Sequence, residues 1–176
     1  MTREIPLTRG YVALVDDDDY DWLSEHRWSA VGSEAKGVYA ATQVRVAGQR
    51  RTVLMHRLIA GATPGQLVDH VDGATLDNRK ANMRLCTHSQ NMQNSRRRDG
   101  GYKGVTRHRG LWRAAICVDR RTIQSRVLTS AIAAARAYDR LALEHHCEFA
   151  KLNFPPKHDW LFPHEAVGVW PPGPDL

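Results

Sequence analysis

The middle of the chain alternates between short apolar runs and a long polar loop, and this pattern leaves few local folds open. Residues 66–71 have the length and composition of a short strand, and residues 83–87 have the alternating side chains of a return strand. Residues 72–82 between them are rich in Asp and Asn, and a helix is expected from residue 88 to about residue 95. The sequence therefore predicts a strand, a loop, a second strand and a helix packed across both strands.

Four polar side chains in this segment have a spacing that suits catalysis. Asp69 and His70 are neighbours on the first strand, so they point to opposite faces, and one can hold a cation while the other acts as a base. Asn91, one turn into the helix, can add a second oxygen ligand, and such oxygens suit Mg²⁺, Mn²⁺ or Ca²⁺ better than zinc. A neutral imidazole can take a proton from an attacking water. The amide of Asn82 can bond backbone groups where the loop closes.

Each of these residues alone has an ordinary structural interpretation. An Asp-His pair is commonly structural, and a loop asparagine is commonly a turn residue. The joint spacing is more informative, because Asn82 follows His70 by twelve residues and Asn91 follows nine residues later. This spacing favours hydrolysis of a phosphodiester bond with one bound metal ion.

Asp69-His70, Asn82 and Asn91 resemble the His-Asn-His (HNH) nuclease motif in the variant found in phage and intron-borne homing endonucleases. The similarity covers about residues 55–94, and 55–59 is similar to the lead-in helix of that family. The resemblance implies a ββα-metal (His-Me finger) fold, cleavage of DNA strands that leaves 5′-phosphate and 3′-hydroxyl ends, and a phage origin. It also implies that His70 is the general base, that Asn82 braces the catalytic loop, and that Asp69 and Asn91 bind one Mg²⁺ or Mn²⁺.

Positive charge is concentrated in one block of the chain. Residues 79–126 carry 13 Lys and Arg and only two Asp, whereas the remaining regions are slightly acidic. A basic run can simply be a solvated face, but a block this lopsided favours a polyanionic partner, because each neutralised phosphate releases counterions. The Arg96-Arg97-Arg98 run lies inside the block and, with the glycines that follow, predicts a basic linker over 96–101 that contacts DNA.

Residues 102–154 predict a second folded region. Strands are expected at 104–108, 112–118 and 122–128, and a helix is expected from an N-cap at Ser130 to about residue 146. The helix is rich in alanine, which lets it lie close to a sheet. The fold class predicted for the whole chain is therefore α+β, with a nuclease unit and a three-stranded antiparallel sheet backed by one helix.

Four short motifs in this region, at 102–105, 112–116, 134–140 and 152–155, resemble the Apetala-type (ethylene-response-factor-like) DNA-binding domain. The resemblance implies a three-stranded sheet laid in the DNA major groove. The candidate contacts on the strands and turns are Lys103, Arg107, Arg109, Trp112, Arg113, Arg121 and Arg126. Ser125-Arg126 departs from the Leu-Gly that is usual in that family, which puts the register of the third strand in question.

The N-terminal and C-terminal segments, together with the composition, limit the fold and the cellular location that can be expected. Residues 1–55 predict strands at 11–15, 38–42 and 52–55 with a short acidic-ended helix after Asp16, and residues 155–176 form a Pro-rich tail. The chain lacks an apolar window of about 18 residues, which excludes a membrane span, and its N-terminus has no secretory pattern. Three widely spaced cysteines indicate a reducing compartment, so a cytoplasmic location is expected. The family resemblance implies that the cell is a bacterial or phage-infected one.

The leading hypothesis is a metal-dependent endonuclease that acts on double-stranded DNA as a monomer or homodimer, with nicking of a single strand as one form of this activity. The alternative is a sequence-specific DNA-binding regulator that keeps an inactive HNH scaffold. An RNA-binding function is less well supported, because no platform of stacking aromatic side chains is apparent.

Overall fold

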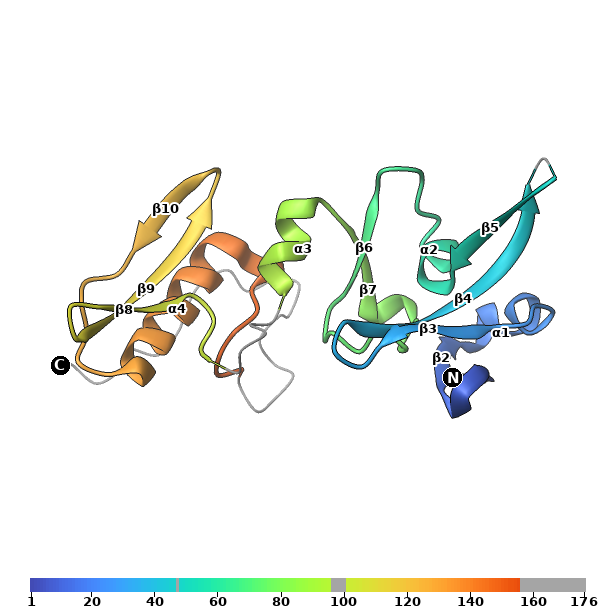
Figure 1. Cartoon of the computed structure of the whole chain (residues 1–176), viewed down its shortest axis with the longest axis horizontal. Coiled ribbons are helices and arrows are strands. Elements are labelled where there is room, and N and C mark those ends of the chain that lie inside the picture. Colours follow the sequence, from blue (N-terminus) through green and yellow to red (C-terminus); the bar gives the residue numbers. More distant parts are fainter. Residues whose placement is uncertain (47, 96–100, 156–176) are drawn as a thin grey trace. The chain divides into compact units, whose positions relative to one another are not determined.

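The computed structural model describes residues 1–46, 48–95 and 101–155. This part of the chain holds four α-helices and several small antiparallel sheets, so the predicted α+β class is confirmed (Figure 1). Within the described residues, contacts define two compact units. The first contains residues 1–95 and 142–151, and the second contains residues 101–141 and 152–155. None of the described helices is both long enough and apolar enough to cross a membrane.

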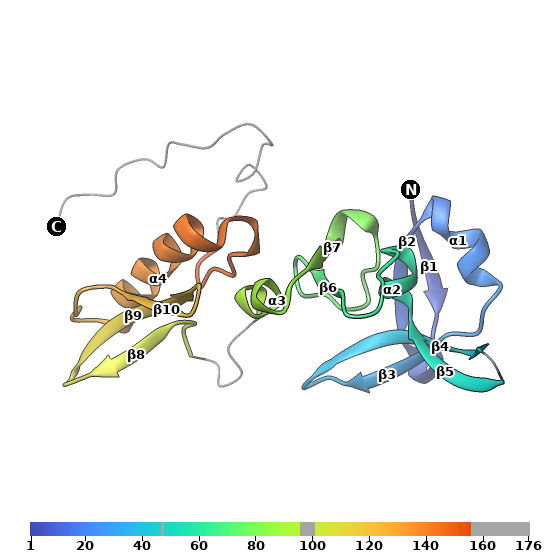
Figure 2. The same ribbon diagram turned by 90° about the horizontal axis from the view of Figure 1, so that it is seen from above.

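The first unit begins with five strands and one helix. In chain order these are β1 (Thr2–Pro6), β2 (Val12–Asp16), α1 (Asp17–Ser24), β3 (Ser29–Ser33), β4 (Gly37–Val46) and β5 (Gln49–Leu54). β1 pairs with β2, and β3, β4 and β5 form an antiparallel sheet in that order (Figure 2). The core includes the fully buried side chains of Val15, Leu23 and Met55. All three strands predicted in this region are present, and β1 and β3 are additional.

The rest of the first unit has the predicted strand, loop, strand and helix order. Its elements are α2 (Met55–Ile59), β6 (Leu67–His70), the 3₁₀ turn η2 (Lys80–Asn82), β7 (Met83–Cys86), α3 (His88–Asn94) and the 3₁₀ turn η3 (Cys147–Phe149). β6 and β7 pair antiparallel. α3 begins at a capping box, in which Thr87 Oγ1 accepts the Gln90 amide and Gln90 Oε1 accepts the Thr87 amide. The loop between β6 and β7 is held on β2, because Leu14 exchanges backbone hydrogen bonds with Leu76 and Asn78.

The second unit is a three-stranded antiparallel sheet in the order β10, β9, β8, with α4 across one face (Figure 2). The elements are β8 (Val105–His108), β9 (Leu111–Val118), β10 (Arg121–Gln124) and α4 (Ala131–His146), whose last turn belongs to the first unit. Ser130 caps α4 as expected, since its Oγ accepts the Ala133 amide. Gly104 has a φ of +68°, and a Cβ there would lie 1.9 Å from the Tyr138 ring, so the helix packs closely only because residue 104 is glycine.

The third strand is shorter than the predicted range 122–128. Its regular pairing with β9 ends at Gln124, which lies opposite Ala115. The next residue pair is an isolated bridge between Leu128 and Trp112. The chain advances four residues from Gln124 to Leu128, while β9 advances three residues between Ala115 and Trp112. One extra residue on one side of a strand pair defines a β-bulge. Ser125 fills the irregular position by accepting the Ala114 amide through Oγ. The bulge therefore falls where Ser125-Arg126 departs from the Apetala-type pattern.

Candidate active site

The β6–β7 register places Asp69 directly opposite Arg84. Arg84 donates to Asp69 Oδ2 through Nε at 3.0 Å and Nη2 at 2.8 Å. Both side chains are largely removed from solvent, with 7% of the Asp69 side chain and 15% of the Arg84 side chain exposed. A buried carboxylate needs such a partner, because an isolated charge in this position would be strongly unfavourable.

Arg84 is itself held by residues far along the chain. Its Nη1 donates to the carbonyl oxygen of Glu148, and its guanidinium carbon lies 3.8 Å from the centre of the Phe149 ring. These partners belong to η3, which forms part of the first unit. The orientation of the Asp69 carboxylate therefore depends on a segment more than 60 residues downstream in the sequence.

Asn94 on α3 is the second partner of Asp69. Its Nδ2 lies 3.0 Å from each carboxylate oxygen and 2.9 Å from the His70 carbonyl oxygen. Asn94 is buried, whereas Asn91, one turn earlier on the same helix, is half-buried. Within the described residues the Asn91 side chain makes no hydrogen bond, so its amide oxygen is available to a ligand.

His70 lies in a buried cluster with two other rings. The His56 ring centre is 5.2 Å away in an edge-to-face arrangement, and the Tyr39 ring centre is 6.2 Å away. His70 Nε2 donates to Asn78 Oδ1 at 3.3 Å, and Asn78 is oriented by donating its own Nδ2 to Met55 Sδ and the Leu76 carbonyl. With the proton of the neutral ring on Nε2, the lone pair of His70 is on Nδ1.

The surroundings favour a neutral His70. Burial lowers its pKa, and this effect exceeds the opposing hydrogen bond to Asn78 and the charges of Asp69, Asp72 and Asp77. Burial, together with the neighbouring His70 and Arg57, lowers the pKa of His56 to about 4. The imidazole on β6 is therefore in the protonation state that a general base requires.

Asn82 makes the loop contacts expected from its position. Its Oδ1 accepts the Asp72 amide at 3.2 Å, and its Nδ2 donates to the Asp77 carbonyl at 3.0 Å. Its backbone carbonyl accepts the Val71 amide at 2.9 Å. Asn82 thus ties together the start and the end of the loop that follows His70.

The donor set beside Asp69 fits a hard divalent cation. No three His, Cys, Asp or Glu side chains gather as a metal cluster in the described part of the chain. The candidate donors are the Asp69 carboxylate and the amide oxygen of Asn91 on α3. Asp69 Oδ2 accepts from Arg84 and Asn94, while Oδ1 accepts from Asn94 alone and keeps lone-pair capacity. Carboxylate and amide oxygens of this kind suit Mg²⁺ or Mn²⁺.

The predicted DNA contacts of the second unit fall on different parts of its sheet. Arg107, Arg109, Arg121 and Arg126 are exposed, and Lys103 is half-buried. Arg113 lies on the sheet face opposite α4 and donates to Gln124, its neighbour on that face. Trp112 lies on the other face, half-buried against the cluster of Val105 and Ala134. Arg96, Arg97 and Arg98 lie outside the described residues.

Several residues of the site were not identified as functional from the sequence. Arg84 could have been found by pairing the two predicted strands across the loop, because the pair of His70 with Met83 places Asp69 opposite Arg84. No sequence pattern marks Asn78 or Tyr39 as part of the site. Asn78 lies in a loop of similar polar residues, and Tyr39 is some 30 residues before the motif. Asn94 shares a helix face with Asn91, and only the fold shows which of them contacts Asp69.

The HNH endonuclease family model matches residues 53–93. This range contains Asp69, His70, Asn82 and Asn91 and ends one residue before Asn94. No curated protein and no solved structure matches the chain. The match supports the HNH part of the resemblance and suggests a nuclease of the HNH type. The Apetala-type resemblance of residues 102–154 stays a prediction.

Proposed function

We propose that this chain is a metal-dependent DNA endonuclease that hydrolyses phosphodiester bonds. The observation that carries the proposal is the pairing, on β6, of a buried carboxylate held by Arg84 and Asn94 with an adjacent neutral imidazole oriented by Asn78. The match of residues 53–93 to the HNH endonuclease family supports it. The order β6, loop, β7, α3 is the one expected of a ββα-metal unit.

In this proposal His70 is the general base. Its Nδ1 lone pair takes the proton of the attacking water, while the Nε2–H bond to Asn78 keeps the ring in one orientation. A general base of this kind contributes about 10²–10⁴-fold to a rate. Asn82 keeps the loop after His70 closed, so that the base stays fixed relative to the substrate.

Asp69 and Asn91 would hold one Mg²⁺ or Mn²⁺. When bound, such an ion neutralises charge on the scissile phosphate and on the leaving oxygen. Arg84 orients the Asp69 carboxylate, and Asn94 links the same carboxylate to the His70 carbonyl. Asn94 therefore contacts both the side chain of Asp69 and the backbone of His70, while Asn78 orients the His70 ring.

The second unit is proposed to select the DNA site. Its exposed arginines and Arg113 on the outer sheet face would contact phosphates or guanine edges in the major groove, and the Arg96–Arg98 run would contact the backbone. One catalytic centre per chain favours a nick by a monomer, whereas a homodimer could cut both strands. A homing role and a phage origin rest only on the family resemblance.

The test is cleavage of supercoiled plasmid DNA in Mg²⁺, in Mn²⁺ and in EDTA. We expect open circles to appear with either metal and not with EDTA, and His70→Ala to lose cleavage while DNA binding is retained. His26→Ala, at an exposed position, is the matched control and should cut normally. Equal cutting by His70→Ala would remove the assignment of the base.

One observation favours the alternative of a DNA-binding regulator with an inactive HNH scaffold. Both oxygens of Asp69 already accept hydrogen bonds, so a metal ion would have to share this carboxylate with Arg84 and Asn94. Tight DNA binding with no cleavage in either metal, at any pH between about 6 and 9, would support the regulator, because neutral imidazole is available throughout that range.

A further inference from the structure

The hairpin formed by β4 and β5 carries two like charges directly opposite each other. Arg45 and Arg50 are cross-strand partners, and both are exposed. In the described part of the chain, neither makes a hydrogen bond or an ion pair. Like charges at directly opposed positions destabilise a two-stranded ladder. The repulsion between Arg45 and Arg50 therefore destabilises the hairpin. A polyanion bound across both side chains would replace this repulsion by attraction.

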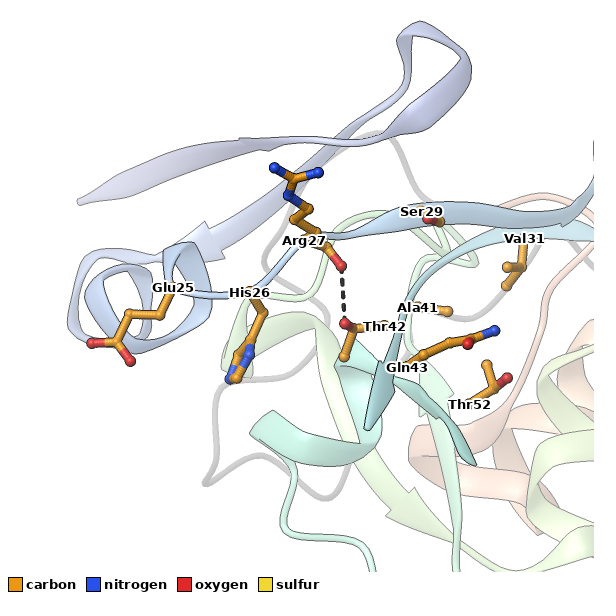
Figure 3. A pocket seen from close by; sticks show the side chains of 9 residues that line it. All are labelled: Glu25, His26, Arg27, Ser29, Val31, Ala41, Thr42, Gln43 and Thr52. Carbon is orange, nitrogen blue, oxygen red and sulfur yellow. Dashed lines mark hydrogen bonds between the residues drawn. The ribbon is translucent and has the colours of Figure 1, made fainter. Parts of the chain in front are cut away.

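The same face of the hairpin carries neutral hydrogen-bonding groups. Side chains alternate along a strand, so Gln43 and its cross-strand partner Thr52 lie on the face of Arg45 and Arg50, one pair nearer the body of the unit. Figure 3 shows Gln43 and Thr52 beside a hollow of about 410 Å³ that also borders Ser29 on β3. Amide and hydroxyl side chains of this kind commonly contact DNA phosphates, together with arginine.

The opposite face of the sheet is used differently. Ala30, Val38 and Ala40 point into the core, and Thr42 Oγ1 donates to the Arg27 carbonyl (Figure 3). Arg51 lies on this second face, since its cross-strand partner is Val44 rather than Arg45. One face of the hairpin therefore combines two arginines with polar hydrogen-bonding side chains. The other face carries Arg51, which can serve as a control for the arginines of the first face.

Both strands of the hairpin lead to the candidate active site. β4 carries Tyr39, which contacts the His56 and His70 rings, and six residues later Arg45. β5 runs directly into α2, where His56 lies. Six residues of extended strand span about 20 Å, which corresponds to about six base pairs of duplex. A duplex bound at His70 and extending about six base pairs along β4 would therefore reach the arginine pair.

We propose that the exposed face of the β4–β5 hairpin binds the phosphate backbone of duplex DNA, with Arg45 and Arg50 as the charged contacts. This inference rests on the proposed function, because it takes DNA as the substrate. It adds a contact surface in the N-terminal strands, outside the basic block of residues 79–126. Phosphate contacts carry no sequence information, so the surface supplies affinity and position rather than specificity.

The experiment measures binding of a labelled mixed-sequence duplex in EDTA, by fluorescence anisotropy, over a series of salt concentrations. Arg45→Gln and Arg50→Gln should each weaken binding by about five- to tenfold near 0.1 M salt and lower the slope of log K against log salt by about 1. Arg51→Gln is the control with the same charge change on the opposite face, and it should bind like the wild type.

A second variant separates binding from stability. Arg50→Glu replaces an opposed like-charge pair by an opposite-charge pair, so the melting temperature should hold or rise while DNA binding falls further. Wild-type salt slopes for the Arg45 and Arg50 variants, or an equal loss for Arg51→Gln, would overturn the proposal. The readout requires no catalysis, so a chain that binds through this face without cutting would contradict only the proposed nuclease activity.

Discussion

Arg84 faces Asp69 across the β6–β7 ladder and binds its carboxylate through two nitrogens, so one cross-strand pair supplies the only arginine that contacts this carboxylate within the described residues. Replacing Arg84 by Ala leaves a buried carboxylate without its charged partner. We expect the free energy of unfolding to fall by about 3 kcal/mol, measured by urea denaturation. Arg3→Ala removes the exposed pair of Arg3 with Asp17 and should cost less than about 1 kcal/mol. Similar losses for the two variants would show that burial does not strengthen the Arg84 pair.

His56 makes the stability of the first unit depend on pH. Its pKa is about 4 in the fold, against about 6.5 in an unfolded chain. Between these values the unfolded chain binds a proton that the folded chain does not. The contribution of neutral His56 to the free energy of unfolding is therefore fully present above about pH 6.5. It is lost as the pH falls towards 4, and the total loss is about 3 kcal/mol.

The measurement is urea unfolding at intervals from pH 7 to pH 4, on the wild type and on His56→Gln. The variant should show a shallower dependence on pH, because it lacks the buried imidazole. His26→Gln, at an exposed position, should retain the wild-type slope. An unchanged slope for His56→Gln would assign the acid sensitivity to other groups.

Asn78 should be needed for catalysis because it orients the ring of His70. Its Oδ1 accepts the Nε2–H of His70, so Asn78→Ala frees the ring to rotate and to change tautomer. We expect the rate of plasmid cleavage to fall by about 10- to 100-fold, within the range that a general base contributes. Asn78→Asp keeps an acceptor for Nε2 and should recover part of the rate. DNA affinity should not change in either variant, and a parallel loss of affinity would indicate a general structural defect.

Gly104→Ala should destabilise the second unit strongly. The added Cβ would overlap the Tyr138 ring, and the φ of +68° is itself unfavourable for alanine. We expect a loss of about 3 kcal/mol in thermal or urea unfolding. Gly110→Ala is the control, since its φ is +82° but no atom lies within 4 Å, and strain alone should cost about 1 kcal/mol. Equal effects at both positions would show that the contact with Tyr138 relaxes easily.

The elements that the sequence predicts correctly are those with strong local signals. The β6, β7 and α3 segments follow from short apolar and alternating runs on either side of a polar loop, and α4 follows from Ser130 and its alanine face. Asn82 closes the loop as expected, because both of its bonding partners lie within ten residues.

The relationships that the sequence does not reveal depend on distance along the chain. Tyr39 reaches His70, and Phe149 reaches Arg84, through contacts between segments separated by tens of residues. The bulge after Gln124 depends on how Ser125 bonds to a neighbouring strand, which local patterns do not encode. Whether Asn91 or Asn94 meets Asp69 depends on the angle at which α3 crosses β6, and this angle is set by packing.

The first unit is discontinuous, since Glu148 and Phe149 complete the surroundings of Arg84 after the whole β8–β10 sheet has been passed in sequence. During translation, Asp69, His70 and Arg84 are synthesised more than 60 residues before Glu148 and Phe149. The β6–β7 hairpin therefore lacks these two contacts until η3 has been synthesised, so the order of translation sets when the surroundings of Arg84 are completed.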